Sequence, residues 1–142
     1  MINIEIIGTG NHNKGSEMML LTLLQELKNT SRRFIFQPSS NIDGYEFYGP
    51  LNLYPKAHLS FKEIDFSFLF KLIPKRLIKR YGLHFDSDIN VVLDVSGFSY
   101  SDQWGFKPAK KLMSKLKKCE KTNVKVFLLP QAYGPFKDFK LR

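Results

Sequence analysis

The first 24 residues change from the pattern of a buried strand to that of a helix, across a loop rich in glycine. Isoleucines dominate residues 2–7, and this short β-branched run predicts a buried strand. Leucine and methionine recur at helical spacing over residues 18–27, and Ser16 precedes them as a candidate helix cap. A strand, a glycine turn and a helix in this order predict the first unit of a parallel α/β sheet.

The loop between this strand and this helix is suited to an anion. Gly8, Gly10 and Gly15 allow positive φ angles and the close approach of a ligand. The start of the helix points unpaired N–H groups and a partial positive charge at the loop. The glycine spacing fits neither the dinucleotide fingerprint nor the phosphate loop of nucleotide hydrolases. Two interpretations stay open, an anion site and a tight structural corner.

The rest of the chain continues this alternation. We expect strands at residues 34–36, 89–93 and 124–129 and an amphipathic helix at 107–121. In that helix Leu112, Met113 and Leu116 should face inward, beneath a lysine-rich outer face. The order predicts an α/β fold, a Rossmann-like parallel sheet with helices on both faces, in one domain over residues 1–142.

The segment between the second and third strands is harder to interpret. Residues 39–60 lack a clean period and predict a long loop with short ordered pieces. Ile64 opens an apolar helical spacing that runs to residue 73, where Pro74 should stop or kink the helix. The basic segment 71–80 then allows two interpretations, a solvated helix face on the sheet or peripheral contact with an anionic membrane.

Composition limits the class of protein. A net charge of +9 invites polyanions, anionic membranes or anionic small molecules. Nucleic acid is disfavoured, because no recognition helix, zinc site or stacking motif accompanies the charge. Cys119 is the single cysteine, so no internal disulfide forms, and no metal-ligand spacing involves His58 or His84. With no secretory signal and no membrane-spanning apolar run, we expect a cytoplasmic protein.

Three loops should meet at the carboxyl ends of the parallel strands, where open α/β sheets bind their ligands. They cover residues 8–17, 94–105 and 130–137. Their sequences N-x-G-S-E-M-M-L at residues 13–20, D-V-S-G-F at 94–98 and Q-A-Y-G-P-F at 131–136 resemble the polysaccharide pyruvyl transferase family in order and spacing. The resemblance covers essentially the whole chain, and the Gly-Pro-Phe element after glutamine is its most specific part.

The chain departs from the family at three points. Ser16 stands where many members have aspartate or alanine, and Ser96 with Gly97 replaces a pair of glycines. Family members are similar to two-lobed transferases of the GT-B type and are more than twice as long. The resemblance therefore implies an amino-terminal lobe without its second lobe.

The resemblance also implies a reaction. Family members transfer a pyruvyl group from phosphoenolpyruvate, a co-substrate, to a sugar hydroxyl of a surface or extracellular polysaccharide, and no further cofactor is implied. The reaction requires a general acid and base, and cationic groups for the phosphate and carboxylate. Because the family's phosphoenolpyruvate-binding residues lie mostly in the second lobe, this lobe is expected to face an acceptor glycan or lipid-linked sugar.

We assign candidate roles on the three loops. Asp94 and Glu17 are the catalytic candidates, although an N-cap would explain Asp94 and the helix dipole would explain Glu17. Tyr100 and Trp104 would stack on a sugar ring unless they pack in the core. His12 would assist with an anion or a proton. The substrate-binding candidates are Asn13, Gly15, Ser16, Gly97, Tyr100, Trp104, Gln131 and Gly134, and no metal ligand is expected.

Three other functions stay open. One is a lobe of a sugar-nucleotide glycosyltransferase, against which the Gln-x-x-Gly-Pro-Phe element argues. Another is a non-catalytic module that binds a glycan or a partner protein, such as a second lobe or a second copy of the chain. The last is nucleic-acid binding, suggested by charge alone. We expect the chain by itself to bind a glycan weakly and to turn nothing over.

Overall fold

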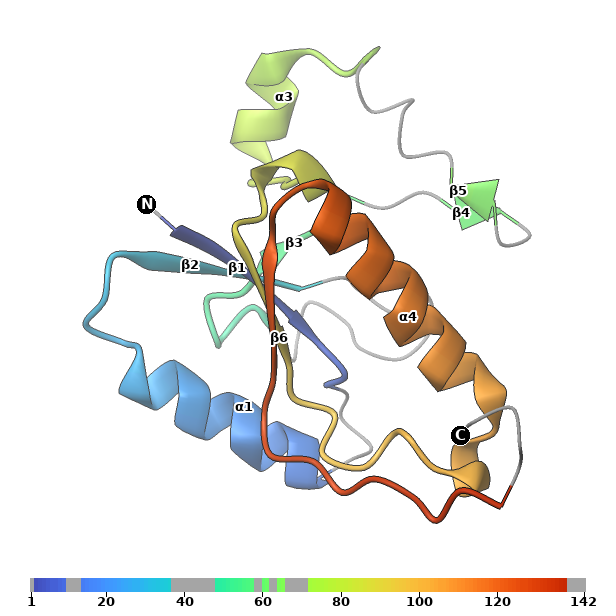
Figure 1. Ribbon diagram of the computed structural model, residues 1–142. Coiled ribbons are helices and arrows are strands. Elements are labelled where there is room, and N and C mark those ends of the chain that lie inside the picture. The colour runs from blue at the N-terminus through green and yellow to red at the C-terminus, as the bar shows by residue number, and fades with distance from the viewer. Residues whose placement is uncertain are drawn as a thin grey trace.

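The fold is a parallel sheet, as the alternating pattern predicts. The computed structural model describes residues 2–9, 14–36, 48–57, 60–61, 64–65 and 72–137. Within these residues the main sheet has the order β3-β2-β1-β6-β7, and all neighbouring strands are parallel. Its strands are β1 (Ile2–Ile7), β2 (Arg32–Phe36), β3 (Tyr54–Pro55), β6 (Val91–Asp94) and β7 (Lys125–Leu128). Figure 1 shows these strands and the helices that connect them.

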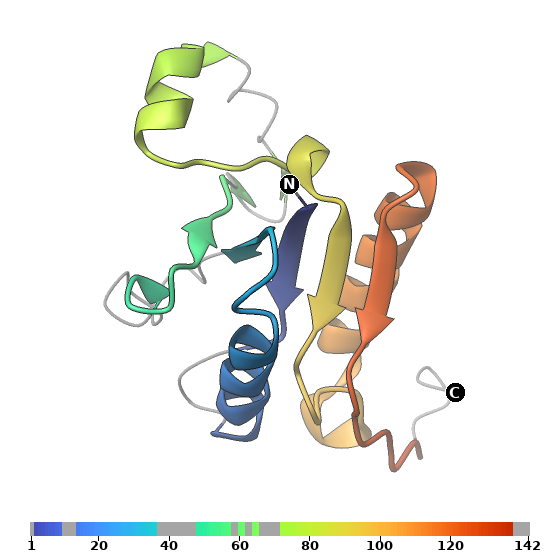
Figure 2. The ribbon, with the colours of Figure 1, turned by 90° about the vertical axis from the view of Figure 1, so that its left-hand side faces the viewer.

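The two long helices cover opposite faces of this sheet. Helix α1 (Lys14–Glu26) connects β1 to β2, and helix α4 (Phe106–Lys121) connects β6 to β7. In Figure 2, α1 lies on the viewer's side of the strands and α4 lies behind them. The crossovers β1-α1-β2 and β6-α4-β7 run in opposite directions along the sheet and place their helices on opposite faces, so the predicted Rossmann-like architecture is confirmed.

Shorter elements lie mostly at the other end of the molecule, away from the carboxyl ends of the strands. Helix α3 (Lys75–Arg80) begins directly after Pro74. Residues 66–71 of the helix expected before Pro74 lie outside the described residues. The remaining elements are the antiparallel pair β4 (Ser60–Phe61) and β5 (Ile64–Asp65), and the 3₁₀ turns η2 (Asp86–Asp88) and η3 (Asp102–Trp104). In the part of the chain that the structure describes, no helix has the length and apolarity required to cross a bilayer.

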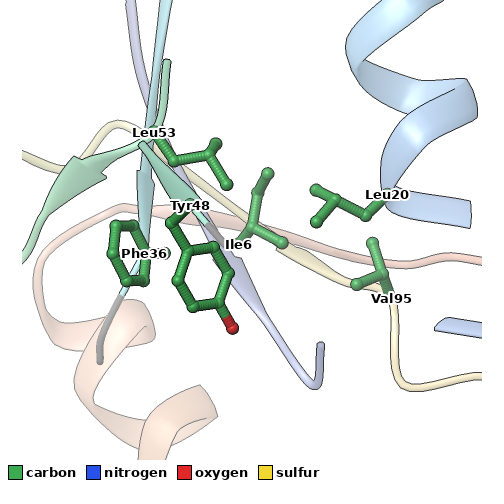
Figure 3. Close-up of a cluster of buried hydrophobic side chains, with 6 residues drawn as sticks. All are labelled: Ile6, Leu20, Phe36, Tyr48, Leu53 and Val95. Carbon is green, nitrogen blue, oxygen red and sulfur yellow. The ribbon is translucent and has the colours of Figure 1, made fainter. Parts of the chain in front are cut away.

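The main hydrophobic core lies between α1 and the sheet (Figure 3). Leu20 is fully buried and packs against side chains from three strands or strand ends and from the segment before β3. The buried members of this core are Ile6, Leu20, Phe36, Tyr48, Leu53 and Val95. Each such side chain contributes about 1.5–3 kcal/mol by leaving water, so this face is a main source of stability.

The other face has a smaller apolar cluster under the carboxyl-terminal end of α4. Cys119 is its helix residue, and it packs against Ile35, Ile89 and Val92. Burial raises the pKa of the Cys119 thiol, which disfavours its reactive thiolate form.

Several local predictions are wrong. Helix α1 begins at Lys14, so Ser16 lies within its first turn and is completely buried instead of capping it. Ile64 lies in strand β5, because the pairing with β4 replaces the expected helix there. On α4, Met113 is 52% exposed and Leu116 is 37% exposed, while Lys115 turns inward to a buried carboxylate. The strand expected at 89–93 extends from Val91 to Asp94.

Candidate functional site

Asp94 ends β6 at the carboxyl edge of the sheet, where the sequence placed a catalytic candidate. Its side chain is completely buried. One carboxylate oxygen accepts the N–H of Ser96 at 2.9 Å, and the other accepts the hydroxyl of Tyr100. Burial and this hydrogen bond to the carboxylate hold the pKa of Tyr100 well above its usual range. The pair therefore keeps the Tyr100 hydroxyl protonated and orders the loop after β6.

Gly8 packs directly against this carboxylate. It follows β1 and has a φ of +78°, which disfavours any residue with a side chain. A Cβ at this position would lie 2.6 Å from Oδ1 of Asp94 and 2.5 Å from Cβ of Ser96. The glycine is required so that the ends of β1 and β6 can approach each other.

The second and third loops form one hydrogen-bonded unit. The Ala132 N–H donates to the Gly97 carbonyl at 2.8 Å, and the Gly134 N–H donates to the Tyr100 carbonyl at 3.1 Å. The Gln131 amide donates to the Asp94 carbonyl at 3.4 Å, and its Oε1 is buried with no hydrogen-bond partner in the described residues. These contacts bring together four residues that the sequence assigned to one site, Gly97, Tyr100, Gln131 and Gly134.

Two aromatic rings at this end of the molecule are accessible to solvent. Trp104 in η3 is 53% exposed, and Tyr133 is 54% exposed. Tyr133 stacks on Tyr100 with the ring centroids 6.1 Å apart, so its orientation is fixed by a half-buried, hydrogen-bonded partner. Tyr133 was absent from the residues assigned by sequence, although it lies inside the Q-A-Y-G-P-F segment.

The first loop reaches the site through the start of α1. Gly15 and Glu17 lie in the first turn, and Glu17 forms an ion pair of 2.7 Å with the exposed Lys14. This position also favours an acidic side chain through the helix dipole. Met19 on the next turn lies against Gly97 of the second loop. The candidates His12 and Asn13 lie outside the described residues.

A cavity of about 480 Å³ extends from this edge beneath α4. Gly8, Thr9, Ser96 and Tyr100 line it at the strand ends. Among the described residues, its charged lining consists of four lysines, Lys56, Lys111, Lys115 and Lys118, and two carboxylates, Glu5 and Asp86. The described lining thus carries a formal excess of two positive charges.

An ion cluster forms the inner wall of the cavity. Glu5 lies in the middle of β1 and is completely buried. Its two carboxylate oxygens accept from Lys56 at 2.7 Å and from Lys115 at 2.5 Å. Asp86 lies 2.5 Å from the Lys56 ammonium and 2.6 Å from that of Lys118. The cluster ties the centre of the sheet to η2 and to α4.

The pKa values in the cluster follow from its charges. Burial raises the pKa of Asp86, but hydrogen bonds from Lys118 and Lys56 outweigh this and hold it well below its usual range. Burial lowers the pKa of Lys56, yet the charges and hydrogen bonds of Glu5 and Asp86 leave it above its ordinary value. For Lys115, burial and the charge of Lys56 outweigh Glu5, and its pKa is lowered.

The sequence analysis missed this cluster, although one signal was present. Glu5 is the one charged residue in a central strand made mostly of isoleucine, and a central parallel strand is buried on both faces. A buried charge at such a position requires a partner. The partners themselves are 51 and 110 residues away in sequence, so no local pattern identifies them.

The surroundings of His84 are charged. His84 is buried beside Arg33, with 3.4 Å between their nitrogens, and lies 3.9 Å from Asp88. Burial and the charge of Arg33 lower its pKa. Within the described ranges, no three His, Cys, Asp or Glu side chains gather as a metal site would require. His58 lies outside these ranges.

Comparison with known proteins adds no assignment. No family model matches the chain, and neither the curated proteins nor the solved structures contain a match to it.

Proposed function

We propose that this chain is the sugar-facing lobe of a polysaccharide pyruvyl transferase-like protein. In this proposal the loops at the carboxyl edge hold an acceptor glycan or lipid-linked sugar, to which a pyruvyl group from phosphoenolpyruvate is transferred. A second lobe, or a second copy of the chain, supplies the remaining donor-binding residues.

The observation that supports the proposal is the joining of the three segments that carry the family resemblance. Residues 94–98 and 131–136 are hydrogen-bonded to each other, and Met19 of α1 lies against Gly97. These segments are far apart in sequence but lie at one edge of the sheet. Binding of one ligand by all of them would explain why each carries its motif. The carboxyl edge is also where open α/β sheets bind ligands.

The geometry suggests a division of roles. Trp104 and Tyr133 present exposed rings on which a sugar can stack. Gln131 has a buried acceptor atom that no described residue pairs with. Asp94 has both carboxylate oxygens in hydrogen bonds, which favours a positioning role for it through Ser96 and Tyr100. Glu17 is the remaining carboxylate candidate for proton transfer, and its side chain is 20% exposed.

Calorimetric titration of the purified chain with a panel of acceptor glycans tests the binding half of the proposal. Trp104→Ala and Tyr133→Ala should each weaken glycan binding about tenfold, the scale expected when an aromatic anchor is removed. Tyr81→Ala is the matched control, because Tyr81 is also well exposed, at 64%, but follows α3 at the opposite end of the molecule. Unchanged binding in both edge variants would contradict the proposal.

Phosphate release from phosphoenolpyruvate, measured with the same glycans, tests the catalytic half. We expect no acceptor-dependent release by the chain alone. Acceptor-dependent release that is lost in Glu17→Gln would show that this lobe suffices for transfer. Glycan binding without release, even when a second lobe is supplied, would favour the alternative of a non-catalytic glycan-binding module.

A further inference from the structure

We infer that the cavity beneath α4 is a binding site for a small phosphate ester, held by Lys111 and Lys115. The cavity begins at the carboxyl ends of β1 and β6 and ends at the ion cluster around Glu5. We draw this inference from the charges and hydroxyls that line the cavity and not from the proposed pyruvyl transfer.

The charge of the cavity matches a dianion. Its described lining has four lysines and two carboxylates, a formal excess of two positive charges among the described residues. Lys111 and Lys115 are one helical turn apart on α4 and both line the cavity. Lys111 has no ion pair with any residue that the structure describes. A phosphate monoester carries close to two negative charges at neutral pH and would balance the excess.

Hydrogen-bond donors remain for such a ligand. An ammonium group has three donors, and Lys115 uses one at 2.5 Å to Glu5 while its distance to Asp86 is 3.7 Å. Thr9 lines the same cavity, and its hydroxyl oxygen is buried without a hydrogen-bond partner among the described residues. Since buried polar atoms are nearly always satisfied, this hydroxyl points to a polar ligand.

The position and size of the cavity agree with this ligand class. From β1 the chain runs outward through β2 to β3 and later returns to β6 on the other side of β1, so the gap between β1 and β6 is the topological switch point. Gly8 and Ser96 lie on its two sides and line the cavity. A volume of about 480 Å³ exceeds what a lone phosphate ion needs and lies in the range of small-molecule sites.

Calorimetry at constant ionic strength tests the inference with three probes, inorganic phosphate, glucose 6-phosphate and glucose. We expect glucose 6-phosphate to bind, and to bind more tightly than glucose. The affinity for inorganic phosphate, compared with that for glucose 6-phosphate, shows whether the site prefers an ester or a free ion. Binding of either one supports the anion site if Lys111→Gln weakens it. Lys111→Gln should weaken binding about tenfold, the effect expected for one charge-assisted hydrogen bond.

The control is Lys117→Gln, which removes the same charge from the same helix but at a residue outside the cavity. Lys115→Gln should reduce affinity at least as much as Lys111→Gln. Because Lys115→Gln also removes a partner of Glu5, Lys111→Gln is the decisive variant. Absence of binding by both phosphate-bearing probes would overturn the inference. Equal losses in Lys111→Gln and Lys117→Gln would overturn it as well, because they would indicate attraction by net charge alone.

Discussion

The two faces of the sheet are built from different chemistry. On the α1 face, Ile6 belongs to an apolar core that Leu20 closes. On the α4 face, the neighbouring residue Glu5 belongs to a buried ion cluster at the wall of a cavity. Because successive side chains of a strand point to opposite faces, adjacent residues of β1 serve these two environments.

The difference separates stability from ligand binding. Burial of apolar side chains stabilises the fold whether or not a ligand is bound. A buried ion cluster often stabilises the fold no more than apolar side chains of the same volume would. Stability alone therefore does not account for the charges on the α4 face. A requirement for an anionic ligand in the adjacent cavity accounts for them.

The largest expected effect comes from removing the central charge of the α4 face. Glu5→Ala removes the carboxylate that Lys56 and Lys115 share. Among the described residues, Asp86 then remains as their carboxylate neighbour. Loss of one member of a buried ion pair costs about 3–5 kcal/mol. Urea denaturation should show this loss. Glu120→Ala, an exposed change on α4, is the control and should stay within about 0.5 kcal/mol. A loss of similar size in both variants would mean that the cluster is not special.

A somewhat smaller loss is expected on the apolar face. Leu20→Ala opens a cavity in the α1 core and should lower the free energy of unfolding by about 3 kcal/mol. Leu21→Ala, next to it on α1 but 43% exposed, should cost less than about 1 kcal/mol. Equal costs for the two leucines would contradict the assignment of this face as the core.

The faces should also differ in their response to acid. The pKa of Asp86 is lowered in the folded state from an ordinary value of 3.8, so the unfolded state binds its proton at higher pH. Its contribution is complete above about pH 5 and is lost progressively as the pH falls below about 4. Urea midpoints between pH 7 and pH 3 should show this decline. In Asp86→Asn the midpoint should be lower at pH 7 and should fall less steeply. An unchanged slope would exclude Asp86 as a source of the decline.

The smallest effect is expected at the ion pair between Lys14 and Glu17. The Lys14 side chain is 81% exposed, and exposed pairs contribute about 0.2–1 kcal/mol. Glu17→Gln should therefore change stability by less than about 1 kcal/mol, and added salt should reduce the difference further. A change comparable to that of Glu5→Ala would contradict the distinction between exposed and buried pairs.

The periodic parts of the sequence were sufficient to predict the architecture. The isoleucine strand and the helix after it are both present, and the alternation of strands and helices gave the parallel sheet with helices on both faces. Periodicity was less reliable for orientation. Met113 was expected on the inward face of α4, but it is exposed. The inward face of the helix is occupied by Lys115 and by the cavity.

The candidate site was predictable where it is local and unpredictable where it depends on distant partners. Gly97, Tyr100, Gln131 and Gly134 were assigned from strand-end loops, and hydrogen bonds join those loops in the structure. The ion cluster joins β1, the end of β3, η2 and α4. Its members share no motif, because each ion pair is a product of tertiary packing.

Thermal unfolding with and without glucose 6-phosphate, applied to an apolar replacement of the cluster, tests the central claim most directly. The variant combines Glu5→Leu, Lys56→Met and Lys115→Leu. In the unaltered chain the ligand should raise the unfolding temperature, because a molecule that binds the folded state stabilises it. The account predicts that the variant unfolds at a similar or higher temperature and shows no rise with glucose 6-phosphate. A variant that keeps the full ligand-induced rise would contradict the claim that the charges of the α4 face serve ligand binding.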